Sequence, residues 1–199
     1  MIKKLYGLDS FVLYPPVRFS SLAGFRFQNR REFAVLVAKP EAASGIMFLS
    51  DIVEKLEKNV RFVVVGRADQ TGLRVVQNLK KKGLRIDYLG YVSEQVKLRL
   101  FHALSHYLHL SLNEPFGITV VEAMASGCIP IAHKSGGVTE YLPEDLLYAS
   151  SSEAAQKIDA GVGLQDSELK KMLRKTAEKF DEEKFRKKFA MYVKLLDLR

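Results

Sequence analysis

Short apolar runs alternate with longer stretches of helical periodicity along most of the chain, and this alternation constrains the fold more than any other feature. Two of the runs, 62–65 and 129–132, are apolar at successive positions, which is typical of strands covered on both faces. Strands separated by helical segments predict right-handed βαβ units and a mostly parallel sheet. The predicted fold class is therefore α/β, a doubly wound Rossmann-like sheet. Strands are expected at 11–14, 34–38, 62–65, 86–89, 107–112, 129–132 and 146–148, and helices at 46–57, 73–82, 94–104, 118–125 and 152–158.

Two regions lie outside this alternation. Residues 1–32 are predicted to hold the first strand and a connector, which begins with Pro15-Pro16. Residues 33–165 form the predicted α/β domain. Residues 166–199 are highly charged and helical, and their last helix carries an apolar stripe that must pack on the domain or on something beyond it.

The chain has 199 residues and a formal net charge of +8, which favours partners that carry negative charge. The basic clusters lie on predicted helices without the interleaved aromatic residues of a single-strand platform, so we expect no nucleic-acid partner. The single cysteine, Cys128, fits a reducing compartment. Since neither a membrane span nor a secretion signal is evident, we expect a cytoplasmic location, with contact to the cytoplasmic face of a membrane left open.

Histidine spacing offers a weak metal signal. His102 and His106 are expected four residues apart on one helix, a spacing that can chelate a metal, and His109 follows. No nearby carboxylate completes the set, so we predict no metal site.

Three turns that follow predicted strands are rich in glycine or charge: 66–69, 113–117 and 133–137. In an open α/β sheet, ligands bind at the carboxyl ends of the strands, where such turns lie. We expect the three turns to meet at one edge of the sheet.

The turn 113–117 carries the most chemistry. Pro115 suits the approach to a helix, and Gly117 lets a ligand come close to the backbone. The helix after it should expose the N–H groups of Gly117, Ile118 and Thr119, which form an anion site together with the helix dipole.

Two glutamates flank this helix start. Glu122 lies one turn further along, roughly 6–7 Å at ~1.5 Å per residue, where a carboxylate can accept hydrogen bonds from both hydroxyls of a ribose. Glu114 lies on the other side of the predicted phosphate, within reach of a transferred sugar. The alternatives are a solvated helix residue for Glu122 and a helix cap for Glu114.

These residues resemble a known family. Glu114-Pro115-Phe116-Gly117, followed by Glu122-Ala123-Met124 and the later Gly136-Gly137, is similar to the donor-binding domain of retaining glycosyltransferases with the GT-B fold. That family includes sucrose and glycogen synthases and many mannosyl- and glucosyltransferases. The resemblance extends from residues 14–17, similar to the interdomain connector, to Glu140.

The resemblance implies a hexosyltransferase that uses a UDP- or GDP-sugar as substrate, without a cofactor or metal. Glu122 would hold the ribose, Glu114 would contact the donor sugar as the catalytic residue, and the loop around Tyr91 would border the base. The implied donor-binding residues are Lys39, Ser44, Gly66, Arg67, Tyr91, Glu114, Phe116, Gly117, Ile118 and Glu122.

The chain departs from the family at two cations. After the first strand of this domain the family has an arginine and, five residues later, a lysine, both directed at the diphosphate; here Lys39 and Ser44 take these positions. Losing one charged hydrogen bond weakens binding roughly 10–150-fold. Arg67, on the neighbouring glycine turn, is a candidate replacement.

A complete GT-B enzyme has two such domains, and only one is recognisable here. We therefore expect an acceptor domain or partner subunit to supply the rest. Two alternatives remain: a non-catalytic subunit that binds nucleotide-sugars, and a basic protein that binds nucleic acid or a membrane surface.

Overall fold

The computed structural model describes residues 2–19, 32–41 and 45–197. Its centre is a sheet of six strands in the order β3-β2-β1-β4-β5-β6, with every neighbouring pair parallel. The predicted doubly wound α/β fold is confirmed. The strands are β1 Glu32–Ala38, β2 Arg61–Val65, β3 Ile86–Tyr88, β4 Leu104–His109, β5 Ile129–His133 and β6 Leu147–Tyr148. The helices are α1 Ile2–Tyr6, α2 Met47–Val53, α3 Gln70–Lys81, α4 Glu94–Ala103, α5 Ile118–Ala125, α6 Ser151–Ala160, α7 Ser167–Ala177 and α8 Glu182–Asp197, with 3₁₀ turns at Gly136–Glu140, Glu144–Leu146 and Glu178–Phe180.

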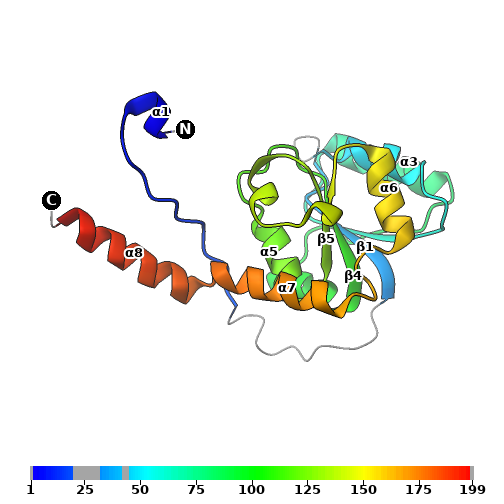
Figure 1. Ribbon diagram of the computed structural model, residues 1–199. Coiled ribbons are helices and arrows are strands. Elements are labelled where there is room, and N and C mark those ends of the chain that lie inside the picture. The colour runs from blue at the N-terminus through cyan, green and yellow to red at the C-terminus, as the bar shows by residue number, and fades with distance from the viewer. Residues whose placement is uncertain (1, 20–31, 42–44, 198–199) are drawn as a thin grey trace.

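Helices cover the sheet on both faces, with α5 and α7 on one side and α3 and α6 on the other (Figure 1). Successive strand residues point to opposite faces of the sheet, so each strand contributes side chains to both hydrophobic cores, one on each face. In β1, Leu36 packs with the core under α4, α5 and α7, whereas Val35 and Val37 pack with the core under α2, α3 and α6. Burial on both faces explains why these strands are continuously apolar.

Most of the longer helices begin at a residue whose side chain accepts a hydrogen bond from the first turn. Asp69, Ser93, Ser150 and Asp166 play this part for α3, α4, α6 and α7. Helix α5 is different, because its N-cap is Gly117, which has no side chain to offer. The start of α5 is therefore left for other partners.

Three predictions about the elements were wrong. Residues 11–14 form no strand: Phe11 stacks on Tyr192 of α8 at 4.7 Å between ring centroids, because its apolar surface is used against helices. Strand β4 covers 104–109 and not 107–112, since the chain leaves the sheet before the turn at Asn113, whose φ is 51°. His106 consequently lies on β4 and not on a helix with His102.

The amino-terminal segment and α8 extend together away from the sheet (Figure 1). Val17 ties them to the domain, since its N–H donates to Phe180 O at 2.8 Å and its carbonyl accepts from Glu182 N at 3.2 Å. We call residues 4–14 and helix α8 the arm. Its apolar side chains are largely exposed, with Phe189 52 % accessible. None of the helices in the described ranges is long and apolar enough to cross a bilayer.

Candidate functional site

The sheet edge expected to bind a ligand lies where the strand order reverses, and we refer to this edge as the crevice. Strand β1 pairs with β2 on one side and with β4 on the other, so the chain winds outward in both directions from the gap between β1 and β4. Such a switch point, at the carboxyl ends of the strands, is where open α/β sheets bind ligands. Lys39 follows β1 directly, and Glu114 lies in the turn that follows β4.

The Glu-Pro turn is held by the glycine pair that follows β5. Gly137 N–H donates to Glu114 O at 2.8 Å. A Cβ atom on Gly136 would lie 2.4 Å from that same carbonyl oxygen, and one on Gly137 would lie 2.0 Å from Pro115 O. Only glycines allow this approach, because real Cβ atoms do not come so close to a backbone oxygen. The backbone of Gly136-Gly137 therefore packs directly against the backbone of Glu114-Pro115.

Gly117, the N-cap residue of α5, has a φ of 84°, in the left-handed region. A Cβ atom there would lie 3.0 Å from both Tyr141 Oη and Val138 Cγ1. Tyr141 Oη donates to Phe116 O at 2.5 Å and fixes the turn from outside. Since Val120 and Val121 N–H both donate to Gly117 O, the α5 ladder begins there, and the N–H groups just before it lie at the helix start.

Glu122 is buried, only 8 % accessible, and this excludes the alternative of a solvated helix residue. Its Oε2 lies 2.7 Å from Lys97 Nζ of helix α4. Burial raises the pKa of the Glu122 carboxyl, and the Lys97 ammonium works against that rise. A carboxylate has two oxygens and about four acceptor positions, so the pair with Lys97 leaves Glu122 acceptor capacity for a ligand.

Glu114 is half-buried and its Oε2 lies 3.5 Å from His109 Nε2. It does not cap α5, whose N-cap carries no side-chain hydrogen bond. Burial lowers the pKa of His109 to about 4, although Glu114 favours the charged form; the charge of Lys39 adds to the lowering. His109 is therefore a neutral neighbour of Glu114 at pH 7.

The opposite side of the crevice is formed by the turns after β1, β2 and β3. Lys39 is exposed with a φ of 55°, and a Cβ on Gly66 would lie 3.2 Å from its backbone nitrogen. Gly66 N–H donates to Gly90 O at 2.8 Å. Beyond it, the Arg67 guanidinium lies over the exposed Tyr91 ring, 5.5 Å from its centroid.

The fold thus gathers the predicted residues along one edge, in two groups. We name the first, Glu114, Phe116, Gly117, Ile118 and Glu122, the carboxylate wall. The second, Lys39, Gly66, Arg67 and Tyr91, is the cation wall. The remaining predicted residue, Ser44, lies outside the described residues.

Sequence reasoning missed two neighbours of the glutamates. Lys97 faces Glu122 from a helix that carries no motif, and no spacing signal could have found it. From the sequence alone, His109 is considered only as a possible metal ligand. Its position at the end of a buried strand, shortly before the Glu-Pro turn, is the signal that places it beside Glu114. Within the residues that the structure describes, no three His, Cys, Asp or Glu side chains gather as a metal site would require.

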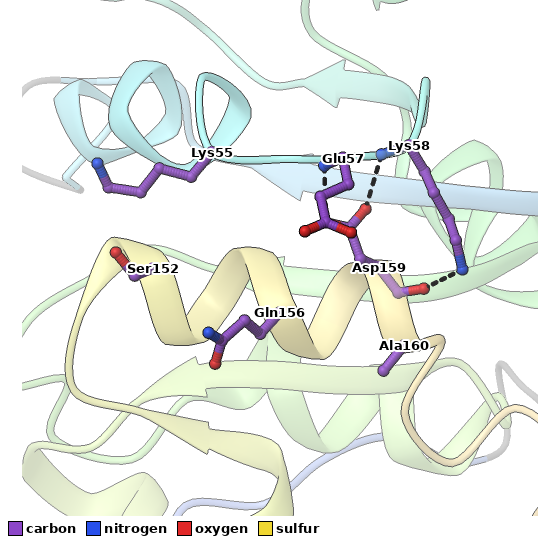
Figure 2. Close-up of a pocket in the computed structure, with 7 residues that line it drawn as sticks. All are labelled: Lys55, Glu57, Lys58, Ser152, Gln156, Asp159 and Ala160. Carbon is purple, nitrogen blue, oxygen red and sulfur yellow. Dashed lines mark hydrogen bonds between the residues drawn. The ribbon is translucent and has the colours of Figure 1, made fainter.

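A separate cavity of about 470 Å³ lies between α2 and α6 (Figure 2). Asp159 fills part of it, with its carboxylate accepting from Glu57 N at 2.8 Å and Lys58 N at 3.1 Å. None of the predicted site residues lines this cavity. The hydrogen bonds drawn there join Glu57 and Lys58 to Asp159, which indicates a structural contact between the segment after α2 and helix α6 (Figure 2).

The fold defines a Rossmann-like α/β domain in which the candidate site residues lie at the switch point of the sheet. The chain belongs to the glycosyl transferases group 1 family, whose model matches residues 24–180. A relative from Dictyostelium discoideum, "GDP-Man:Man(3)GlcNAc(2)-PP-Dol alpha-1,2-mannosyltransferase", is 31% identical over 98% of this chain and 44% of its own length. A glycogen synthase from Elusimicrobium minutum is 24% identical over 60% of this chain and 25% of its own length.

Solved structures agree on the fold. HepE from Anabaena, in complex with UDP and glucose, superposes with a TM-score of 0.65 at 24% identity, over 80% of this chain and 48% of its own. Sucrose-phosphate synthase from Thermosynechococcus elongatus superposes with a TM-score of 0.68 at 20% identity, over 94% of this chain and 50% of its own. The expected GT-B relationship is confirmed. The chain spans about half the length, or less, of these relatives.

Proposed function

We propose that this chain is the donor-binding half of a retaining glycosyltransferase that transfers a hexose from a nucleotide diphosphate sugar without a metal ion. One observation carries the proposal: Glu114 lies in the turn before α5 and Glu122 in its second turn, on either side of a helix start that no side chain caps. Both are close enough to the Tyr107 hydroxyl to favour its protonated form by charge.

In the proposed complex the diphosphate lies against the N–H groups of Gly117 and Ile118, with Lys39 facing it across the crevice. Glu122 accepts from the ribose hydroxyls and Glu114 from the sugar. The bond between the sugar C1 and the diphosphate oxygen breaks, and the acceptor oxygen bonds to C1 on the same face. The helix start and the cation wall take up the charge of the leaving diphosphate, which removes the need for a metal ion.

A GDP-sugar is the first donor to test. The Dictyostelium relative, aligned over 98% of this chain, carries GDP-Man in its name, whereas HepE was solved with UDP and UDP-glucose. The acceptor in the same relative's name is Man(3)GlcNAc(2)-PP-Dol, which supports a lipid-linked acceptor. We propose that transfer takes place at the cytoplasmic face of a membrane, where the net charge of +8 favours anionic lipid.

The acceptor side of the site is proposed to come from a further domain or a partner subunit. The match to sucrose-phosphate synthase includes 94% of this chain but only 50% of that enzyme, so the other half of that enzyme lies outside the match. The arm supports the same proposal, because its exposed apolar residues, Phe189 among them, need a covering surface.

The test is a thermal-shift panel of GDP, UDP, ADP and their hexose conjugates. A ligand that binds only the folded state raises the unfolding midpoint, so the correct nucleotide-sugar should do so. Glu122→Ala should weaken its affinity roughly 10–150-fold, whereas Glu54→Ala, an exposed control beyond the crevice, should leave it unchanged. A panel without any shift would defeat the donor-site proposal.

A non-catalytic subunit that binds nucleotide-sugars is the second candidate, and Ser44 favours it, because it takes the position at which the family has a lysine directed at the diphosphate. Donor hydrolysis and transfer should be measured for the chain alone and then with a candidate acceptor domain. Binding without turnover in every combination would establish this second function.

A further inference from the structure

Two consecutive inward positions of β4 carry buried polar side chains below the carboxylate wall. Tyr107 and His109 are 1 % and 2 % accessible, and both point to the face covered by α5, because they are two residues apart on a strand. Tyr107 Oη lies 3.0 Å from His109 Nδ1. The Tyr107 hydroxyl also hydrogen-bonds Thr119 in the first turn of α5.

The other ring nitrogen of His109 faces the site. His109 Nε2 has no hydrogen-bond partner among the residues that the structure describes, and Glu114 Oε2 lies 3.5 Å away from it. A buried ring N–H without a partner is unfavourable, and contacts of this kind often tighten only when ligand is bound. A small movement of the Glu114 carboxylate would complete the bond.

The direction of each hydrogen bond follows from the protonation states. Burial raises the pKa of Tyr107, so its hydroxyl keeps a proton to donate. Burial lowers the pKa of His109 to about 4, so the ring carries one proton at neutral pH. If Tyr107 donates to Nδ1, that proton must be on Nε2, directed at Glu114.

We propose that His109 is a positioning residue, which orients the Glu114 carboxylate toward the donor sugar and is itself held in the correct tautomer by Tyr107. The chain Thr119–Tyr107–His109–Glu114 joins the helix start, where the diphosphate is proposed to lie, to the carboxylate that contacts the sugar. The inference rests on the proposed function, since it assigns a task to Glu114 in that site.

The experiment compares the affinity of each variant for a nucleotide-sugar with its affinity for the same nucleotide diphosphate without sugar. Because Glu114 contacts only the sugar, misplacing it should lower the ratio of the two affinities, about tenfold for His109→Leu. His109→Gln should restore most of the ratio, since its amide can place an N–H where Nε2 lies. Tyr107→Phe should give an intermediate loss, because the ring can then adopt either tautomer.

His106→Leu is the matched control. His106 is a buried histidine of the same strand that faces the other way, with Nε2 3.0 Å from Val162 O, so its loss should cost stability and leave the ratio unchanged. The wild-type protein offers a test without substitution: the ring-nitrogen NMR shifts of His109 should show the Nε2–H tautomer at pH 7.

An unchanged ratio in His109→Leu, or an Nδ1–H tautomer in the wild-type protein, would overturn the positioning role while leaving the proposed function intact. Equal losses in His109→Leu and His109→Gln would also overturn it, because a merely structural role predicts no rescue. Failure of the wild-type chain to bind any nucleotide-sugar would overturn both proposals.

Discussion

The two walls of the crevice are built in different ways. In the carboxylate wall, Lys97 pairs with Glu122, and the glycine pair holds the backbone of the Glu-Pro turn, so this backbone is in place before any ligand arrives. The cation wall consists of exposed side chains, Lys39 and the Arg67–Tyr91 stack, on turns that touch one another mainly through backbone. A wall with a fixed backbone selects a ligand by shape, whereas exposed side chains supply positive charge and can change rotamer to fit the ligand.

The largest effect is expected from Gly137→Ala, which would break the carboxylate wall. Its Cβ would meet Pro115 O at 2.0 Å, so the Glu-Pro turn must move, at a cost of about 3 kcal/mol in unfolding free energy. Gly83→Ala is the control, because it has a φ of 81° but open space, and should cost about 1 kcal/mol. Denaturant unfolding measures both, and equal losses would mean that the turn has room to adjust.

Lys97→Met should cost about 1–2 kcal/mol at pH 7.5, because Glu122 would remain buried without its cation. The loss should shrink as the pH falls, since burial already raises the pKa of Glu122 and a protonated carboxyl no longer needs the partner. Urea unfolding at pH 7.5 and 5.5 measures this. The double variant Lys97→Met, Glu122→Gln should recover stability at pH 7.5; if it does not, the ion pair is not the cause.

The neutral state of His109 predicts acid sensitivity in the same wall. Its ordinary pKa of 6.5 falls to about 4 in the folded chain, so the unfolded chain binds the extra proton first as the pH drops. The contribution of His109 is therefore complete above pH 6.5 and is lost as the pH falls toward 4, by up to about 1 kcal/mol per pH unit.

The difference between wild type and His109→Gln isolates this contribution from the rest of the chain. His106 and His133, whose pKa values are also lowered, act in the same direction, and Glu122 acts in the opposite one. Unfolding curves from pH 7.5 to 4.5 should converge for the two proteins at the acid end. Parallel curves would show that His109 is charged or accessible.

The smallest effect is expected on the cation wall. Arg67→Ala should reduce nucleotide affinity only a few-fold, because an ion pair made by an exposed side chain contributes about 0.2–1 kcal/mol. Titration calorimetry with the nucleotide found in the panel measures it. A loss approaching that of Glu122→Ala would show that Arg67 replaces the missing lysine, whereas no loss would exclude it from the site.

The sequence predicted the sheet well, and with it the gathering of the turns after the strands at one edge, because both follow from local periodicity and from the parallel order of the strands. It predicted the burial of neither glutamate, since that depends on residues far away in sequence: Lys97 on α4 and Gly137 after β5. The error at 11–14 has the same origin. An apolar run indicates burial, but whether it packs in a sheet or against Tyr192 is decided by tertiary contacts.

The two backbone hydrogen bonds of Val17, to Phe180 and Glu182, have a mechanical consequence. The chain enters the domain at Val17 and leaves it at Asp181, and these two residues form a parallel bridge. A body attached through the arm would be linked to the sheet by two adjacent crossings of the backbone and not by one. Two crossings side by side resist twisting about the link but still allow bending across it.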